Sequence, residues 1–335
     1  MDILITGATG FLGSTLISKI FDENFFENIN IYAFVLPKDK FQKNLSKWKN
    51  LKIIYGDITN FDEINNAICG KDIVINCAGL ISYWKKDYNK LINVNVNGVK
   101  NIVESCIKNK VKKLIHISSV GAIGFHKDGR PAEEETPFNY PDCLYYMKSK
   151  YLGQLIVEKA IEEKILNAVI LCPASIMGPG DPDINTPHNQ IYQKVYKNKM
   201  FGSFKGGLAV VDVRDIAQII IKNIKNNFPE GKYLIVGKNL KYKEVLKTIE
   251  KYSKKKVYPF IISPIILSFV GFILEILSYI TRRKPLLTFG YGLLSGWKTF
   301  YSNEKSCRIF KHSYIDFEKT IEDSCQYFEI NFLNN

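Results

Sequence analysis

Three side chains in the middle of the sequence have the types and spacing that proton transfer requires. Tyr146 and Lys150 lie four residues apart in a stretch with a helical pattern, which places them on one face of a helix. The phenol of tyrosine has an ordinary pKa of about 10, and a nearby ammonium group lowers this pKa because it favours the phenolate. Ser119, at the end of a strand-like run, can hold a substrate oxygen by a hydrogen bond. Together they predict acid–base chemistry at a carbonyl or hydroxyl group.

A neighbouring tyrosine competes for the same role. Tyr145 has Ser149 rather than a lysine four residues later, so Tyr146 is favoured as the acid–base group. A tyrosine and a lysine at this spacing also occur as an exposed pair on many helices. The catalytic interpretation therefore depends on a glycine-rich segment near the start of the chain.

That segment joins the first strand-like run, 2–6, to a helical pattern. The free N–H groups and the dipole at a helix N-terminus favour an anion. Glycines allow a tight turn, close approach of a phosphate and close packing of the helix on a sheet. The segment predicts a dinucleotide diphosphate site, and a tight turn without a ligand is the alternative. The candidate binding residues are Gly7, Thr9, Gly10, Phe11, Leu12 and Gly13.

Short apolar runs alternate with helical patterns through the first two thirds of the chain, which predicts a parallel sheet covered on both faces. We expect an α/β, Rossmann-type doubly wound sheet with a smaller, mostly C-terminal α+β substrate-binding part. Residues 1–173 form the dinucleotide-binding domain, to which 207–236 contribute, and 174–206 and 237–335 form the substrate-binding part. The expected strands are 2–6, 30–35, 52–55, 72–76, 113–117, 168–171 and 232–236, and the expected helices are 11–21, 61–68, 87–108, 145–164, 212–223 and 242–252.

The chain resembles the extended short-chain dehydrogenase/reductases, the NAD-dependent epimerase/dehydratase superfamily. The glycine spacing is GxxGxxG rather than GxGxxG. Asp57-Ile58 resembles the adenine-contacting pair of the superfamily, Asn76-Cys77-Ala78-Gly79 its element after the fourth strand, and Asn95-Val96-Asn97-Gly98 its NVxG helix element. The segment from Leu171-Cys172-Pro173 to Gly178-Pro179-Gly180-Asp181 resembles its turn at the nicotinamide, with Cys172 in place of the usual arginine.

The resemblance implies a role for each residue. Tyr146 would donate or accept the proton, Lys150 would tune it and bind the nicotinamide ribose, and Ser119 would orient the substrate oxygen. Ser119 is favoured over Ser118 because it lies five residues before Gly124, as in relatives with an SSxxxxG segment. The further cofactor contacts implied are Asp57, Ile58, Ala78, Gly79 and Pro173.

The choice between NAD and NADP depends on the end of the second strand. An acidic residue there would bind the ribose 2′-hydroxyl, and a basic residue would accept a 2′-phosphate. The run 30–37 has neither, but Lys38 and Lys40 follow it. The sequence therefore favours NADP over NAD.

The segments Ser118–Gly124 and Gly206–Asp215 resemble the dihydroflavonol-reductase and 3β-hydroxysteroid-dehydrogenase branch. We therefore expect an NAD(P)-dependent oxidoreductase that interconverts a secondary alcohol and a ketone on an apolar small molecule. A nucleotide-sugar epimerase with tightly bound NAD is the first alternative; it is disfavoured by Ser175 at a position where epimerases commonly carry Asn and by the scarcity of arginine. A non-catalytic protein that binds the cofactor as a regulator or scaffold is the second.

The composition of the chain limits the kinds of partner and compartment that we expect. The net charge is +13, but the lysines are scattered, so we expect no nucleic-acid partner. Seven cysteines without metal-ligand spacing favour a reducing, cytoplasmic compartment and no metal. His116 and His188 are expected to be structural. The resemblance implies a homodimer formed through the helices 87–108 and 145–164.

An apolar segment, Pro259–Ile280, contains one charged residue, Glu275, and is followed by Arg282-Arg283-Lys284. We expect a helix that packs on the core or covers an apolar pocket. Peripheral membrane contact through 264–281 is the alternative, and a membrane-spanning helix is disfavoured because Glu275 would lie at mid-bilayer. On such a helix one narrow stripe is small or polar: Ser268, Gly271, Glu275 and Ser278.

Overall fold

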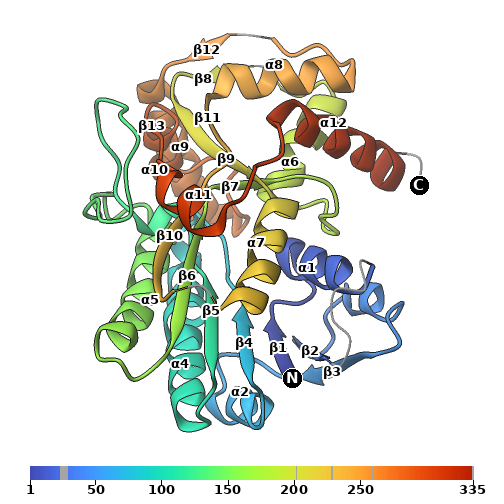
Figure 1. Cartoon of the computed structure of the whole chain (residues 1–335). Helices are drawn as coiled ribbons and strands as arrows, with labels where there is room; N and C mark the ends of the chain where they lie inside the picture. Colours follow the sequence, from blue (N-terminus) through green and yellow to red (C-terminus); the bar gives the residue numbers. More distant parts are fainter. Residues whose placement is uncertain (23–28, 201, 228, 259, 334–335) are drawn as a thin grey trace.

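A seven-stranded parallel sheet forms the larger part of the computed structural model, which describes residues 1–22, 29–200, 202–227, 229–258 and 260–333 (Figure 1). Pro259 of the apolar segment therefore lies outside the described residues. The strand order β10-β6-β5-β4-β1-β2-β3 confirms the predicted doubly wound fold. The strands are β1 (Asp2–Thr6), β2 (Asn30–Val35), β3 (Leu51–Tyr55), β4 (Ile73–Asn76), β5 (Lys113–Ile117), β6 (Ala168–Pro173) and β10 (Gly231–Ile235).

Helices cover both faces of this sheet. One layer contains α1 and α7, which pack together, and the other contains α2, α4 and α5. The central strands are buried along their whole length: every residue of β5 and β6 is buried, as expected of strands covered on both sides. The helices are α1 (Phe11–Asp22), α2 (Phe61–Ile68), α4 (Gly98–Lys108), α5 (Tyr145–Glu162) and α7 (Val213–Asn226).

A smaller sheet lies beyond the carboxyl ends of the large one (Figure 1). In it β9 pairs with β7, β11 and β13, and a separate pair joins β8 to β12. Within 207–236, α7 and β10 belong to the large sheet and its helices, whereas β9 belongs to the small sheet; the division of the chain into two domains stays a prediction. The strands are β7 (Ser175–Met177), β8 (Ser203–Phe204), β9 (Gly207–Asp212), β11 (Lys238–Lys241), β12 (Ile261–Ile262) and β13 (Lys298–Thr299).

The helices of the smaller part surround this sheet and carry their own apolar core. Buried residues of α6, α8 and α12, such as Tyr192, Ile249 and Phe328, pack together there. The helices are α6 (Pro187–Tyr196), α8 (Tyr242–Ser253), α9 (Pro264–Thr281), α10 (Phe289–Leu294) and α12 (Phe317–Phe328), and a π turn at Glu329–Leu333 follows α12. The helix α11 (Glu304–Phe310) instead packs on β10 and α7 of the larger part.

The single helix expected over 87–108 is divided by a π turn at Asn93–Asn97. A 3₁₀ turn, Lys85–Asp87, and α3 (Tyr88–Ile92) precede the π turn, and α4 follows it. The backbone here lies close to α5: a Cβ atom on Gly153 would be 2.0 Å from the carbonyl oxygen of Asn95. Single π turns inside helices occur often at functional sites, and this one presents the side chain of Asn95 to the neighbouring elements.

The substitution Gly153→Ala should destabilise the fold by about 3 kcal/mol, because the added methyl group would overlap the Asn95 backbone. Helix propensity alone would predict a gain of about 1 kcal/mol. Leu155→Ala, at an exposed position of the same helix, is the control and should change stability by less than about 0.5 kcal/mol. Urea unfolding measures both, and a Gly153→Ala variant as stable as the original chain would contradict the packing described here.

Candidate active site

The residues that the sequence marks for chemistry lie at one edge of the large sheet. This is the edge formed by the carboxyl ends of the strands, on both sides of the point between β1 and β4 where the strand order reverses, which is where open α/β sheets bind ligands. Gly7 follows β1, Asp57 follows β3, Ala78 and Gly79 follow β4, Ser119 follows β5, and Pro173 ends β6.

Each glycine of the first loop meets a different constraint. Gly7 has φ of +63°, and a Cβ atom there would be 2.7 Å from the backbone nitrogen of Ala78. A Cβ atom on Gly13 would be 2.2 Å from the carbonyl oxygen of Gly7. Gly10 differs, because its Cβ atom would meet only the Gly7 carbonyl oxygen, at 3.4 Å. Gly10 therefore leaves open space at the N-terminus of α1, which fits the diphosphate of a dinucleotide.

Buried polar side chains hold the end of β4 in place. The hydroxyl of Thr6 donates to Oδ1 of Asn76 at 2.7 Å, and Oδ1 also accepts the backbone N–H of Ala78 at 3.2 Å. The Nδ2 group of Asn76 lies 3.0 Å from Nδ1 of His116. Burial and the nearby Lys150 keep the pKa of His116 well below its ordinary value, so its neutral ring accepts this bond. His116 is thus structural, as expected.

Ser119 and Tyr146 are joined by a hydrogen bond between their hydroxyl groups. Ser119 caps the short turn Val120–Ala122, and its Oγ accepts the backbone N–H of Gly121 at 3.0 Å. A hydroxyl group can accept one bond and donate another, so the Ser119 proton can point to the phenol while its oxygen accepts the Gly121 N–H. Burial raises the pKa of Tyr146, and the bond with Ser119 opposes this change only in part. The expectation of a lowered Tyr146 pKa was therefore wrong, since burial outweighs stabilisation of the phenolate.

Lys150 is buried one turn later on α5. Its Nζ donates to the carbonyl oxygen of Ile117 at 2.9 Å, and burial lowers the pKa of Lys150 to about 8. A Cβ atom on Gly79 would be 3.8 Å from this Nζ and 3.5 Å from Oδ1 of Asn95. Lys150 is therefore held between the end of β5 and the loop after β4, where glycine gives a ligand access.

Asn95 connects these elements. Its amide exchanges hydrogen bonds with the backbone of Leu80, at 2.8 and 2.9 Å, and donates to Oγ of Ser149 at 2.9 Å. The family resemblance singled out the surrounding NVxG element, but it assigned no role to Asn95. The contacts show that Asn95 ties the loop after β4 to the helix that carries Tyr146 and Lys150.

Two tyrosines close to Tyr146 were missed by the sequence reasoning. The ring centroid of Tyr83 lies 6.0 Å from that of Tyr146 and 5.1 Å from that of Tyr291 on α10. Burial raises the pKa of Tyr83 and of Tyr291, so both stay uncharged. Neither residue belongs to a spacing pattern, and only the fold brings them together. They belong to an aromatic cluster that also contains Phe125, Phe138, Tyr140, Met147, Leu144, Leu294 and Trp297.

Asp39 was also missed, because it follows the second strand by four residues. Its Oδ2 accepts the hydroxyl of Thr9, in the glycine-rich loop, at 2.9 Å. The neighbouring Lys40 instead contacts Asp183, at 3.3 Å. A carboxylate therefore lies directly beside the loop, at the end where the sequence alone indicated lysines.

The remaining predicted residues lie around this edge. Leu12 is buried on α1, and the ring of Phe11 stacks on that of His188 at 4.9 Å, in keeping with a structural role for His188. Oδ1 of Asp57 accepts the backbone N–H of Thr59, and Ile58 is buried. Cys172 behaves as a packed thiol, because burial raises its pKa to about 12. Among the described residues no group of three or more His, Cys, Asp or Glu side chains could hold a metal ion.

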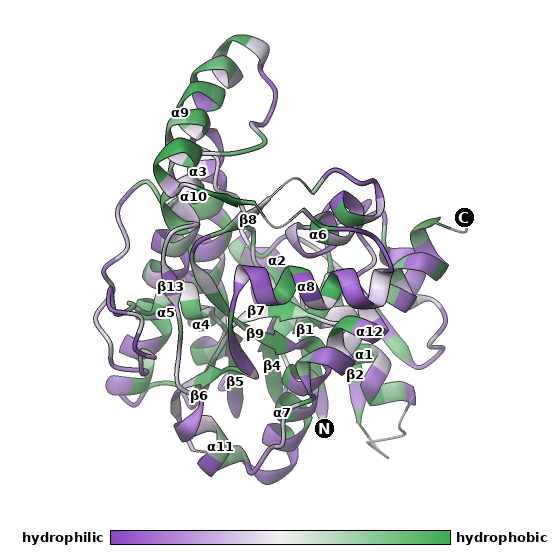
Figure 2. Cartoon of the chain, turned by 90° about the horizontal axis from the view of Figure 1, so that it is seen from above, coloured by the Kyte–Doolittle hydropathy of each residue, from purple (hydrophilic) through white to green (hydrophobic). Residues whose placement is uncertain are grey.

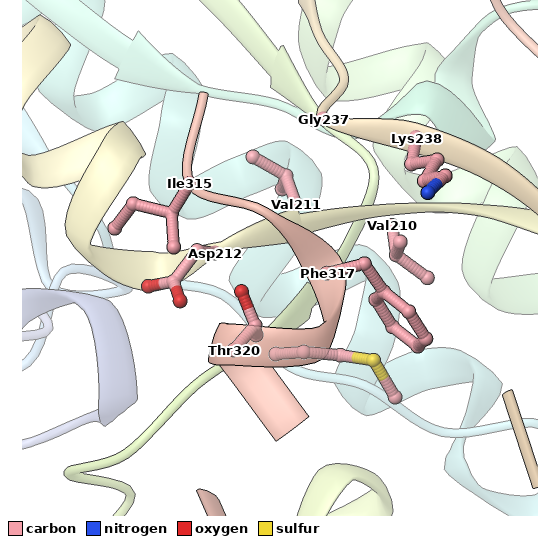
Figure 3. Close-up of a pocket in the computed structure, with 9 residues that line it drawn as sticks. Val210, Val211, Asp212, Gly237, Lys238, Ile315, Phe317 and Thr320 are labelled. Atoms are coloured by element: carbon pink, nitrogen blue, oxygen red, sulfur yellow. The ribbon is translucent and has the colours of Figure 1, made fainter. Parts of the chain in front are cut away.

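A separate small pocket lies between β9 and the start of α12 (Figure 3). It has room for about one water molecule. Asp212 in its wall is already engaged, since it caps α7 and pairs with Arg214. None of the predicted catalytic residues lines this pocket, so it is not part of the candidate active site. The lining residues are Met177, Val210, Val211, Asp212, Gly237, Lys238, Ile315, Phe317 and Thr320.

Residues 4–234, well over half of the chain, match the model of the 3-beta hydroxysteroid dehydrogenase/isomerase family. The chain belongs to this family. This agrees with the resemblance stated from the motifs.

Named members of the 3-beta hydroxysteroid dehydrogenase/isomerase family and its neighbours are similar over part of their length. The chain is 31% identical over 185 residues to the 3 beta-hydroxysteroid dehydrogenase/Delta 5-->4-isomerase of Monkeypox virus, which is 53% of each chain. It is 32% identical over 183 residues to the decarboxylating sterol-4-alpha-carboxylate 3-dehydrogenase of Saccharomyces cerevisiae, 53% of this chain and 52% of that one. The match thus spans about half the length of these relatives.

Solved structures match the whole fold. The crystal structure of gox2253 aligns with a TM-score of 0.82 and 25% identity, over 99% of this chain and 98% of that chain. UDP-glucuronic acid 4-epimerase from Bacillus cereus, in complex with UDP-glucuronic acid and NAD, aligns with a TM-score of 0.77 and 18% identity, over 99% of this chain and 100% of that chain. At this low identity the epimerase likeness shows the fold alone.

Because burial lowers the pKa of Lys150, the free energy of unfolding should depend on pH. Between about pH 8 and its unfolded value of about 10.4, the unfolded chain binds more protons at this residue than the folded chain, so the folded state gains stability as pH rises. Lys150→Met lacks this gain. The difference in the free energy of unfolding, original chain minus variant, should increase by on the order of 2 kcal/mol from about pH 7.5 to about pH 10.5.

Urea unfolding across this pH range measures the difference, and Lys148→Met is the control. Lys148 is paired with Asp142, which raises its pKa, so the Lys148→Met difference should show no such increase. A pH-independent difference for Lys150→Met would mean that Lys150 is not held in the buried site described here.

Proposed function

We propose that the protein is an NAD(P)-dependent oxidoreductase that interconverts a secondary alcohol and a ketone on an apolar small molecule. The observation that carries the proposal is the hydrogen-bonded pair of Ser119 and Tyr146 beside buried Lys150, at the sheet edge where Gly10 leaves room for a diphosphate. The names of its relatives, which include dehydrogenases and reductases, support this class of reaction.

The nicotinamide cofactor would be held by the loop from Gly7 to Gly13 and by Lys150, and it supplies the hydride. The chain supplies the proton and the geometry. Because the pKa of Tyr146 is raised, its phenol is protonated at neutral pH and can give a proton to a carbonyl oxygen. Once Tyr146 has lost its proton, the Ser119 hydroxyl donates to the phenolate and so stabilises its negative charge. Asn95 positions α5 against the loop after β4.

The surroundings of Tyr146 favour an apolar substrate. Tyr83, Tyr291 and the aromatic cluster leave little that could bind a charged group beside the phenol. A nucleotide-sugar epimerase must bind a diphosphate, for which arginine is the usual partner. Arg214 is already paired with Asp212 at 2.7 Å and with Asp323 at 2.6 Å. These contacts support the ketone reaction over the epimerase alternative.

The contact of Asp39 with Thr9 argues for NAD, whereas Lys38 and Lys40 argue for NADP. A carboxylate beside the loop disfavours a 2′-phosphate by like-charge repulsion. Lys40 is occupied by Asp183. We therefore propose that Asp39 gives a preference for NAD. The cytoplasmic location and the homodimer through α4 and α5 stay predictions.

Tyr146→Phe should lower kcat for reduction of hydrophobic ketones by about 100-fold or more, because the proton donor is lost while the ring keeps its packing. Cofactor affinity should be retained. Tyr145→Phe, one residue earlier on α5, is the matched control and should keep near-original activity. The assay follows NADH and NADPH oxidation with a panel of ketones, and UDP-sugars are tested alongside. Turnover of UDP-sugars without turnover of any ketone would refute the proposed substrate class.

Asp39→Asn should raise affinity for NADPH relative to NADH by about ten-fold, which corresponds to about 1.4 kcal/mol. The change removes the charge and keeps a group that can accept the Thr9 hydroxyl. Asp62→Asn is the control, because Asp62 is an exposed residue in the first turn of α2. Fluorescence titration with each reduced cofactor measures the ratio, and an original chain that already binds NADPH more tightly would show that the lysines decide the preference.

A further inference from the structure

The helix α9 is largely hydrophobic and projects from the body of the molecule (Figure 2). Many of its large apolar side chains are exposed. The expectation that this segment packs on the core was wrong for most of the helix. Within α9 only Ser268, Gly271 and Ser278 are buried. By length and composition α9 could also cross a membrane, which alone is weak evidence because core helices of soluble proteins pass the same test.

The narrow stripe of small and polar residues faces the protein. A Cβ atom on Gly271 would be 2.5 Å from the carbonyl carbon of Thr288, and one on Gly292 of α10 would be 2.5 Å from Cα of Ser268. The helix backbones can approach this closely only because these side chains are small. Glu275, the single acidic residue of α9, lies on this stripe and accepts the backbone N–H of Phe289 at 3.1 Å. Packing therefore fixes α9 with its polar stripe inward.

The opposite side of α9 is a continuous apolar face. Spacings of three and four residues place its members side by side along the helix. Ile265 is 80% exposed, Phe269 63% and Ile280 76%. A monomeric protein seldom leaves so many large apolar side chains together in water, and such patches mark interaction sites. The α9 apolar face consists of Ile265, Ile266, Phe269, Ile273, Ile276, Leu277 and Ile280.

Cations and amphipathic aromatic rings border the C-terminal end of this face. Arg282 and Arg283 follow directly and are exposed. The ammonium of Lys86 donates to the carbonyl oxygen of Ser278 at 3.3 Å and lies 4.5 Å from the ring centroid of Tyr279. Nε1 of Trp84 donates to Oγ of Ser278 at 3.1 Å. Apolar side chains bordered by arginine, lysine, tryptophan and tyrosine match the layered chemistry of a lipid surface.

We propose that α9 docks the protein on a phospholipid bilayer that contains anionic lipids, with the helix in the plane of the interface. The α9 apolar face enters the boundary of the acyl chains, and Arg282 and Arg283 contact the negative headgroups. The choice of lipid over a second copy of the chain rests on this charge complementarity, because Glu275 is turned inward and the basic residues lie at the exposed end. The proposal concerns lipid binding and does not depend on the proposed reaction.

Flotation of the full chain with vesicles tests the proposal. One set of vesicles contains phosphatidylcholine alone, and the other contains about one third phosphatidylserine. The double variant Phe269→Ser/Ile280→Ser should reduce binding to both by about ten-fold or more. Its control is Tyr55→Ser/Ile165→Ser, which removes two exposed apolar side chains elsewhere and should bind as the original chain does.

A second pair of double variants tests the contribution of Arg282 and Arg283. Arg282→Gln/Arg283→Gln should lose roughly ten-fold in affinity for the anionic vesicles and little for the neutral ones. Lys197→Gln/Lys199→Gln, exposed after α6, should keep the original affinity. Thermal unfolding verifies that every variant is folded.

Two results would overturn the proposal. In the first, the original chain, Phe269→Ser/Ile280→Ser and Tyr55→Ser/Ile165→Ser bind vesicles equally, or none of them binds. In the second, size-exclusion chromatography with light scattering finds a dimer that Phe269→Ser/Ile280→Ser dissociates, without vesicle binding by the original chain. That second result would assign the α9 apolar face to a second copy of the chain.

Discussion

The carboxyl ends of β1, β4 and β5 lie side by side because these strands pair in parallel, and the candidate active site depends on that register. The register brings the backbone of Gly7 against that of Cys77 and Ala78, so closely that a side chain at Gly7 would not fit. The same sheet places Ile117, whose carbonyl oxygen holds Lys150, next to the loop after β4. A change of strand register would separate the glycine-rich loop from Ser119 and Lys150.

Burial then sets the electrostatics of the site. It lowers the pKa of Lys150 and raises that of Tyr146, so it disfavours the charged form of each. The hydrogen bond with Ser119 opposes the effect of burial on the pKa of Tyr146 in part. The aromatic side chains around Tyr146 come from both parts of the chain: Tyr83, Phe125, Phe138 and Tyr140 come from the first 173 residues, and Tyr291 and Trp297 from the smaller part. The large sheet therefore positions Ser119, Tyr146 and Lys150, and the smaller part completes the aromatic surroundings with Tyr291 and Trp297.

The sequence predicted those features that depend on local spacing. The glycine-rich loop, the spacing of Tyr146 and Lys150 on one helix and the strands of the large sheet follow from residues close together in the chain, whereas the short strands of the smaller part do not. Three features could not be predicted in this way. Asp39 reaches Thr9 and Tyr291 reaches Tyr83 only through the tertiary fold. The orientation of α9 was also open, because its pattern shows two kinds of face but not which one the protein covers. The small size of Ser268 and Gly271 settles this, since it permits close packing on α10.

We propose that the carboxyl edge of the large sheet holds a dinucleotide site directly beside an acid–base group. Hydrogen–deuterium exchange of the full chain, with and without NADH, tests this most directly. We expect NADH to slow exchange of the backbone amides in four segments together: residues 7–13, 78–80 and 118–121 and the start of α5. Protection confined to the glycine-rich loop, or located away from this edge, would contradict it.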